Sequence, residues 1–365
     1  MNATAILCSG LLTHAAFAAA PSDGSEFINL ERLSDRVVLA YWVGLDRRCN
    51  LTAIRTEKGL VLIDSEMSPR IMAPIKAKFE RALGRSDWVY VINTHAHDSH
   101  PGGNSLFQGA QIVGHENLER DLQWIIRKQA DPDVKQRALD QGEQYIANLR
   151  TNLALGPHLS ASQARLVRGE IRFWELYNQD LREGYPVVTP SLTFSDTRTL
   201  DLGDLQLELV FFGKGHSLSD TLVYLPQEKL LVTGATLYQR AQFPEIGEET
   251  DRQDLQRFLI VLDRFLSDDA TIDHVVPSHS PPVLKRDLAP IRDYYQRMLT
   301  GVEWAQRQGL TFEQAKAQLP ASLFPAFKVR PPGVWSCGFH DRNLRNLWRI
   351  LKEPAVHPDS LPRPS

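Results

Sequence analysis

The chain has 365 residues, enough for one large domain or two ordinary ones. Its 41 basic and 44 acidic residues give a formal net charge of −3, without the excess of positive charge that nucleic-acid-binding proteins carry. Beyond the N-terminal region, no stretch approaches the length of an apolar membrane span. We therefore expect neither a nucleic-acid partner nor a membrane span in the mature chain.

The first 20 residues are typical of a secretory signal peptide. An apolar run at 5–12 precedes a tail of small residues at 15–20, which predicts cleavage near Ala18 or Ala20 and an exported, periplasmic protein. A retained strand or helix is the alternative, because the segment lacks a basic start. After cleavage, Cys49 and Cys337 would remain, either as one disulfide or as two buried thiols.

Short apolar runs between turn residues predict strands in two groups. The expected strands cover residues 36–43, 51–56, 59–64, 88–92 and 110–114, and then 191–194, 205–212, 220–225, 229–233 and 274–277. The strands at 220–225 and 229–233 are expected to form a hairpin.

Helical periodicity occupies the segments between and after the strands. Residues 69–83 follow Ser68 as N-cap, and 115–183 predict a helical insertion with a break at Gly156-Pro157. Further helices are expected at 103–107, at 252–266 and from 288 onward, where the last one covers 343–351. This order predicts an α/β fold of two packed sheets with helices outside and a site along one edge.

The stretch 91–104 carries the most informative cluster of polar residues. An apolar strand ends in His95, His97 and His100, so that three of only eleven histidines fall within six residues. Neutral imidazoles are zinc ligands, and an H-x-H pair on an extended backbone can direct two rings toward one ion. A solvated loop that merely contains histidines is the alternative. The stretch predicts a metal site at the end of a strand.

Three later strand ends supply polar partners for this loop. They are Gly215-His216-Ser217-Leu218-Ser219-Asp220, Thr233-Gly234-Ala235-Thr236 and Pro277-Ser278-His279-Ser280. With the H-x-H-x-x-H loop, this set and spacing resembles the metallo-β-lactamase superfamily over residues 36–282. The resemblance implies a four-layer αββα sandwich that binds one or two metal ions, usually zinc. We expect a metallo-β-lactamase-like domain at 27–285 with its helical insertion at about 116–186, and a helical C-terminal extension at 286–365 packed on that domain.

The resemblance implies that His95, His97 and His216 hold the first metal ion and leave a fourth position open for water. It also implies that His100 and His279 are ligands of a second ion.

Two positions depart from the family pattern. Ser99 stands where the family carries an aspartate, and Ala235 stands where many relatives carry a bridging carboxylate. Two dications a few ångström apart repel strongly without carboxylates between them. We therefore expect one firmly bound zinc ion, with a dinuclear site and a site that has lost its metal as the alternatives.

The missing aspartate also affects the expected mechanism. Ser99 can hydrogen-bond a bound water, and His100 or His279, if not a ligand, can act as general base or hold the leaving group. Asp98 comes one position early and should point to the other side of the loop. Asp64 is expected to support the histidine loop through hydrogen bonds, and Asp220 either supports His216 or caps the next strand.

Other conspicuous residues have a simpler structural interpretation. His115, His274 and His340 are expected to be structural, with His340 at the start of a helix. Five aromatic residues are expected in the core, with a pocket wall formed by the insertion as the alternative: Trp124, Trp174, Tyr177, Trp335 and Phe339.

The sequence thus predicts an exported, mononuclear zinc hydrolase that attacks an ester, thioester, lactone or lactam with metal-bound hydroxide. A sulfate ester is a further candidate substrate, and a dedicated antibiotic-resistance enzyme is disfavoured because of the large insertion. The alternative is a non-catalytic periplasmic metal- or ligand-binding protein on the same fold. A flavoprotein partner is disfavoured, since no flavin-binding domain follows. The oligomeric state is not readable.

Overall fold

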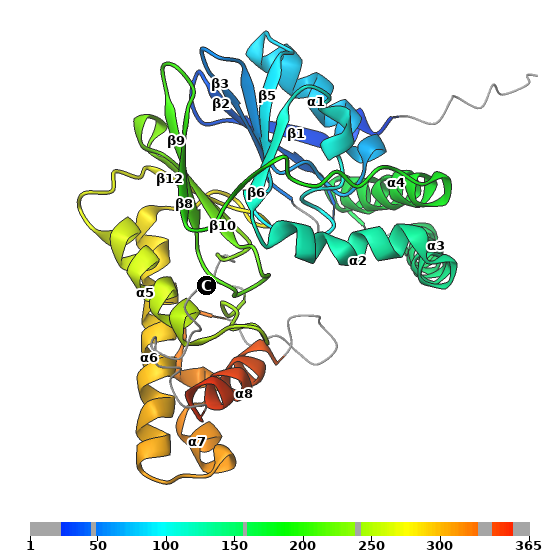
Figure 1. The fold of residues 1–365 in the computed structure, drawn as a ribbon. Coiled ribbons are helices and arrows are strands. Elements are labelled where there is room, and N and C mark those ends of the chain that lie inside the picture. Colours follow the sequence, from blue (N-terminus) through cyan, green and yellow to red (C-terminus); the bar gives the residue numbers. More distant parts are fainter. Residues whose placement is uncertain (1–22, 45–48, 156–158, 238–241, 328–337, 353–365) are drawn as a thin grey trace, which may run out of the picture.

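Two β-sheets pack face to face in the computed structural model, which describes residues 23–44, 49–155, 159–237, 242–327 and 338–352 (Figure 1). The first sheet has the order β1-β2-β3-β4-β5-β6-β7 and the second the order β12-β11-β10-β9-β8. Helices cover the outer faces of the two sheets, and a helical C-terminal segment packs beside the second sheet. The expected α/β sandwich is confirmed.

The strands of the first sheet are β1 (Ile28–Arg32), β2 (Val37–Trp42), β3 (Leu51–Arg55), β4 (Leu60–Ile63), β5 (Trp88–Ile92), β6 (Gln111–His115) and β7 (Leu192–Phe194). Those of the second are β8 (Thr197–Asp201), β9 (Gln206–Phe211), β10 (Thr221–Leu225), β11 (Leu230–Gly234) and β12 (His274–Pro277). The expected hairpin is confirmed, because β10 and β11 pair antiparallel.

The helices are α1 (Pro69–Leu83), α2 (Leu118–Ala130), α3 (Pro132–Leu155), α4 (Ala161–Glu183), α5 (Arg252–Leu266), α6 (Ala289–Arg307), α7 (Phe312–Gln318) and α8 (Phe339–Lys352). Helices α2, α3 and α4 form the insertion that the sequence predicted. No helix in the described residues is long and apolar enough to cross a membrane.

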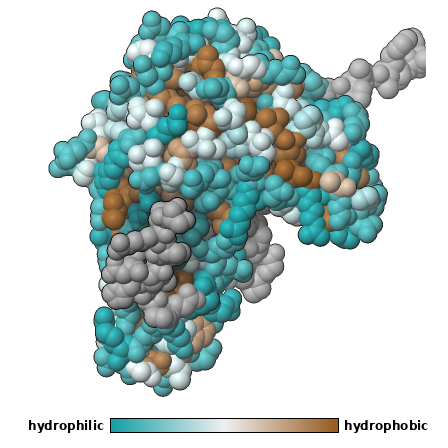
Figure 2. Space-filling model, viewed as in Figure 1, coloured by the Kyte–Doolittle hydropathy of each residue, from teal (hydrophilic) through white to brown (hydrophobic). Residues whose placement is uncertain are grey.

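Alternating residues of the buried strands reach two different cores, since successive strand side chains point to opposite faces. In β2, Leu39 packs between the two sheets, whereas Val38 packs with α1 and α4 on the outer face. A third core lies outside the second sheet, where α5, α6 and α8 pack together. Most of the face shown in Figure 2 is hydrophilic, with small apolar patches.

Two strands, β1 and β8, were not predicted from the sequence, and both are polar strands at the edge of a sheet. β1 reads INLER and β8 reads TRTLD, and each alternates buried or half-buried with exposed residues at the edge of its sheet. Edge strands bury little apolar surface, so their sequences lack a continuous apolar run. The helix expected at 103–107 is only a 3₁₀ turn (Asn104–Leu106).

Several predictions concern residues outside those that the structure describes. These are the signal peptide at 1–20, the helix break at Gly156-Pro157, and the positions of Trp335 and Cys337. They remain predictions.

Candidate metal centre

Three histidines from two loops meet at one end of the sandwich. His95 and His97 follow β5, and His216 lies in the loop between β9 and β10. One ring nitrogen from each residue lies within 4.8 Å of the others. The ring centroids are 5.0 Å apart for His95 and His97, and 4.3 Å apart for His97 and His216. In the described part of the chain, no other cluster of histidine, cysteine, aspartate and glutamate ligand atoms is this close.

This arrangement fits a divalent metal ion. The Nε2 atom of His95 is buried and makes no hydrogen bond to the described residues, although burying an unpaired polar atom is costly. Burial and the neighbouring imidazoles hold the pKa of His95 well below its ordinary value, which keeps the ring neutral, as a metal ligand must be. His97 is exposed, so the site opens to solvent on that side. Three imidazoles with an open side form a typical zinc donor set.

His100 and His279 lie next to this cluster but do not join it. The His100 ring centroid is 3.9 Å from that of His95 and 5.4 Å from that of His279. The Nδ1 atom of His100 contacts Asp64 Oδ2 at 2.8 Å, whereas its Nε2 is buried without a hydrogen bond among the described residues. The structure therefore places His100 beside the three-histidine cluster and His279 beside His100, without a second three-ligand group in the described residues, and their role as ligands of a second ion stays a prediction.

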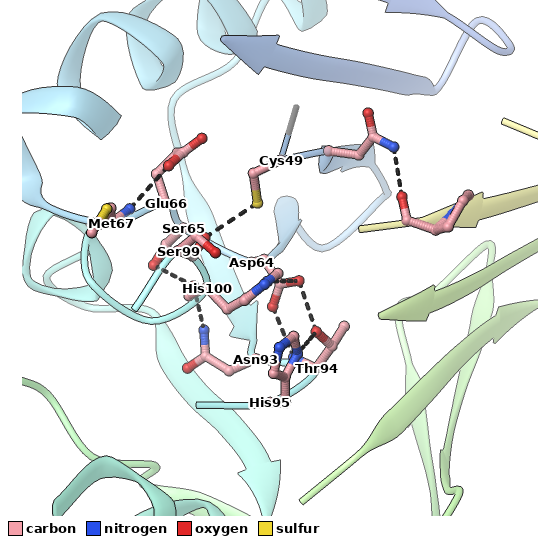
Figure 3. A network of polar contacts seen from close by, with 12 residues as sticks. Cys49, Asp64, Ser65, Glu66, Met67, Asn93, Thr94, His95, Ser99 and His100 are labelled. Atoms are coloured by element: carbon pink, nitrogen blue, oxygen red, sulfur yellow. Dashed lines mark hydrogen bonds and ion pairs between the residues drawn. The ribbon is translucent and has the colours of Figure 1, made fainter. Parts of the chain in front are cut away.

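Asp64 contacts the first histidine loop through its carboxylate (Figure 3). Its carboxylate accepts hydrogen bonds from the backbone N–H and the hydroxyl of Thr94, both at 2.8 Å, in addition to the contact with His100. Asp64 is itself buried and has a left-handed φ of 61°, a conformation that only a strong set of contacts sustains in a residue other than glycine. The supporting position expected for Asp64 agrees with these contacts.

The Gly-Gly pair behind the histidines allows the loop to pack tightly. A Cβ atom on Gly102 would lie 2.1 Å from the carbonyl oxygen of Met67, which leaves no room for a side chain. The backbone N–H of Ser65 and the side chain of Asn93 both donate to the carbonyl oxygen of His100, at 2.6 Å and 3.1 Å. These two hydrogen bonds hold the backbone of His100 and so fix the direction in which its side chain points.

A protein-family model matches more than half of the chain. The family model described as "Metallo-beta-lactamase superfamily" matches residues 44–279. This chain belongs to the metallo-β-lactamase superfamily. Its fold resembles that of the stereoselective inverting sec-alkylsulfatase Pisa1 from Pseudomonas sp., with a TM-score of 0.60 and 18% identity over 92% of this chain and 52% of that chain.

A metallo-beta-lactamase from Pontibacter korlensis also matches, with a TM-score of 0.49 and 20% identity over 74% of this chain and 99% of that one. The present chain thus spans about half the length of the alkylsulfatase structure. A search of curated proteins found no match. At 18% identity, the similarity to the alkylsulfatase structure supports the fold and leaves the substrate open.

Two residues between the histidines, Asp98 and Ser99, make contacts outside the three-histidine cluster. Asp98 accepts a hydrogen bond from Trp124 Nε1 at 2.9 Å and forms an ion pair with the buried Lys128, both on α2. The aspartate thus faces the insertion, although residues 97–100 form a turn and not the extended loop from which this direction was expected. The carbonyl oxygen of Ser99 accepts a hydrogen bond from Cys49 Sγ at 3.2 Å, and burial raises the pKa of that thiol. The proposed contact of Ser99 with water stays a prediction.

Trp124 corrects the expectation that the conspicuous aromatics belong to the core. Its side chain is 52% exposed, and it lines a cavity of about 320 Å³ together with Ala96, His97 and Asp121. The insertion therefore forms a wall beside the histidines, which was the alternative. Trp174 and Tyr177 do pack in the core that includes α4, and Phe339 packs in the core that includes α8.

The second histidine loop is held by three carboxylates. Asp220 accepts the backbone N–H groups of His216 and Ser217 at 2.7 and 3.0 Å, and burial raises the pKa of Asp220 to about 6. Asp121 on α2 accepts from the hydroxyl of Ser219 at 2.6 Å. The expected support of His216 by Asp220 agrees with this geometry.

Glu245 is the third carboxylate, and sequence reasoning missed it. Its Oε1 lies 2.7 Å from His216 Nδ1, the kind of carboxylate contact that orients a histidine ligand. Burial acts to lower the pKa of His216, but the charge and hydrogen bond of Glu245 outweigh it and raise that pKa above its ordinary value. Glu245 lies in a loop without a motif, 29 residues beyond His216, so nothing in the sequence indicated the contact.

Among the described residues, three further histidines lie outside this site. His115 is buried, stacks on Phe211 and has its Nε2 3.0 Å from the carbonyl oxygen of Ser195. His340 is the second residue of α8, and its Nε2 donates to the carbonyl oxygen of Leu319 at 2.7 Å. His274 begins β12.

Proposed function

We propose that this protein is an exported hydrolase that uses one zinc ion held by His95, His97 and His216. The observation that carries the proposal is the convergence of the three rings, with the buried His95 Nε2 left for a ligand. When bound, a zinc ion supplies a Lewis acid and lowers the pKa of a coordinated water toward neutrality. Membership of a superfamily that contains hydrolases supports the same reaction class.

The residues around the three histidines supply the other parts of a hydrolytic site. Asp64 contacts His100 Nδ1 and thereby leaves Nε2 as the nitrogen that can accept a proton from water or return one to a leaving group. His279 lies on the far side of His100 and is the second candidate for this proton transfer. Ser99 is proposed to orient the water by a hydrogen bond, since a hydroxyl is a poor proton acceptor.

The proposed substrate is a small molecule with an ester, thioester, lactone or lactam bond. The cavity beside His97 offers Trp124 as an apolar surface for the part of the substrate that does not react. An alkyl sulfate belongs in the test panel as well, because one structure with the same fold is named as a sec-alkylsulfatase.

Metal analysis and a hydrolysis panel test this proposal on the purified full-length chain. We expect about one zinc ion per chain and turnover of at least one panel compound. The variant His216→Ala should lose the bound zinc and at least about a hundredfold of the activity, because one of three ligands is gone. His274→Ala, which removes a histidine at the start of β12, is the matched control and should keep both.

Absence of zinc from a fully folded protein would contradict the proposal. Zinc binding without turnover of any panel compound would instead support the non-catalytic binding protein. N-terminal sequencing of the exported protein tests the proposed cleavage near Ala18 or Ala20.

A further inference from the structure

The C-terminal helix α8 contacts the loop that carries Glu245, although it lies 60 residues beyond the segment that the family model matches. The Nη2 atom of Arg342 on α8 donates to Glu245 Oε2 at 2.5 Å, while Glu245 Oε1 contacts His216 Nδ1. A continuous chain of contacts therefore runs from α8 to a proposed metal ligand. The side chains of His216 and Glu245 are 6% and 11% exposed, so water screens the first contact only weakly.

Helix α8 also fixes the backbone on both sides of Glu245. Asn343 is fully buried, and its side chain donates to the carbonyl oxygen of Pro244 at 2.6 Å and accepts from the N–H of Ile246 at 2.9 Å. One turn later, Asn346 donates to the carbonyl oxygen of Ile246 at 2.8 Å. Two asparagines on one face of α8 thus hold the main chain that presents Glu245.

The same loop packs directly against the backbone before His216. A Cβ atom on Gly247 would lie 2.6 Å from the carbonyl oxygen of Gly215, so this approach requires glycine. From α6, the hydroxyl of Tyr295 donates to the carbonyl oxygen of Glu245 at 3.0 Å. The position of Glu245 is therefore set by two C-terminal helices and by the loop of His216 itself.

We propose that Glu245 and Arg342 are positioning residues that link the packing of α8 to the metal affinity of His216. A carboxylate on Nδ1 fixes the tautomer and orientation of a histidine ligand, and the loss of such a partner typically lowers metal affinity 10- to 100-fold. Arg342 holds the second oxygen of that carboxylate, so α8 and the metal ion stabilise the same arrangement of Glu245. By thermodynamic linkage, metal binding must then stabilise the packed α8 in return.

This inference rests on the metal-binding part of the proposed function, and zinc titration of the full chain separates the two. Metal-free protein is titrated with zinc against a chromophoric chelator. We expect Glu245→Gln to bind zinc about 10- to 100-fold more weakly than the parent, and Arg342→Met about fivefold more weakly. Arg342→Lys keeps the charge and should recover most of the affinity.

Arg349→Met is the matched control on the same helix. Arg349 donates a hydrogen bond to the backbone carbonyl of Glu248 at 2.6 Å. The substitution therefore removes a contact between α8 and the loop and leaves the Glu245 carboxylate unchanged. The zinc affinity of Arg349→Met should equal that of the parent. An equal loss in Arg349→Met would mean that any loosening of α8 weakens zinc binding, and would overturn the specific role of Arg342.

Hydrogen exchange of α8 supplies a readout that a merely structural contact would not change. Zinc should slow exchange of the α8 amides in the parent and have no such effect in Glu245→Gln. If the parent binds no zinc, the proposed function fails. If the parent binds zinc and Glu245→Gln binds it equally well, with the same α8 protection, only the present inference fails.

Discussion

The two histidine loops of this protein are held in place in different ways. The first loop, with His95 and His97, rests on Asp64, a residue 30 positions from its partner Thr94 and part of the same half of the sandwich. The second loop, with His216, depends on Asp121 from the insertion and on Glu245, whose partner Arg342 lies 97 positions further along the chain. The carboxylate that supports the first loop therefore lies close by in the sequence, whereas the second loop has, besides the nearby Asp220, supports from the insertion and, through Glu245, from the C-terminal helix α8.

The comparison predicts the largest loss of stability in the first loop. Asp64→Asn replaces a buried carboxylate that accepts two hydrogen bonds from Thr94 and contacts His100. We expect the free energy of unfolding to fall by about 3 kcal/mol, since hydrogen bonds to charged groups contribute roughly 1.5–3 kcal/mol and buried partners are left unsatisfied. Urea denaturation of the metal-free protein measures this. A loss below that of the Asp121 variant would contradict the comparison.

A smaller loss is expected where the insertion holds the second loop. Asp121→Asn weakens two hydrogen bonds, from the hydroxyl of Ser219 and from the N–H of Leu218 at 3.1 Å. Burial already raises the pKa of Asp121, so part of the cost of burying the charge disappears in the amide. We expect a destabilisation of about 1 kcal/mol in the same denaturation experiment.

The contact between Glu245 and His216 should make the free energy of unfolding depend on pH. In the metal-free protein, Glu245 raises the pKa of His216 above its ordinary 6.5. The stabilisation from this pair is fully present below pH 6.5 and is lost as the pH rises through the raised pKa. Glu245→Gln should therefore cost more stability at pH 6 than at pH 9, because the charged His216 that the carboxylate stabilises is present only at the lower pH.

Denaturation of the metal-free parent and variant at both pH values checks this difference. Arg349→Met serves as the control, because its contact involves a backbone carbonyl and should cost the same at both pH values. An equal cost of Glu245→Gln at pH 6 and pH 9 would show that Glu245 does not raise the pKa of His216.

The smallest loss of stability is expected for a substitution of Trp124 in the wall of the cavity. Trp124→Ala should change the free energy of unfolding by only about 0.5 kcal/mol, because the side chain is 52% exposed. If Trp124 contacts the substrate, KM should rise about 3- to 10-fold through lost apolar contact, with zinc content unchanged. Steady-state kinetics on the best panel compound measure this rise. An unchanged KM would leave the insertion as a support for the second loop alone.

Much of the fold was readable from the sequence because its buried strands and amphipathic helices leave strong patterns. The helices at 69–83 and 252–266 were predicted with the bounds that the structure has, since each presents a long apolar face, although Ser68 makes no side-chain capping hydrogen bond. The edge strands β1 and β8 were missed because half of each strand faces water. Trp124 was misassigned because an aromatic residue at helical spacing looks the same whether it faces a core or a cavity.

The sequence by itself was enough to predict that the histidines of the candidate site lie at strand ends. Short motifs and the period of buried strands are local properties of the chain. The sequence also led us to expect that Asp98 points away from the other loop side chains, although the structure has a turn at residues 97–100 where the sequence suggested an extended loop. Only the tertiary structure decided that Glu245 and Arg342 meet at His216. Contacts between segments 97 residues apart depend on how the helices pack, and no local pattern records that packing.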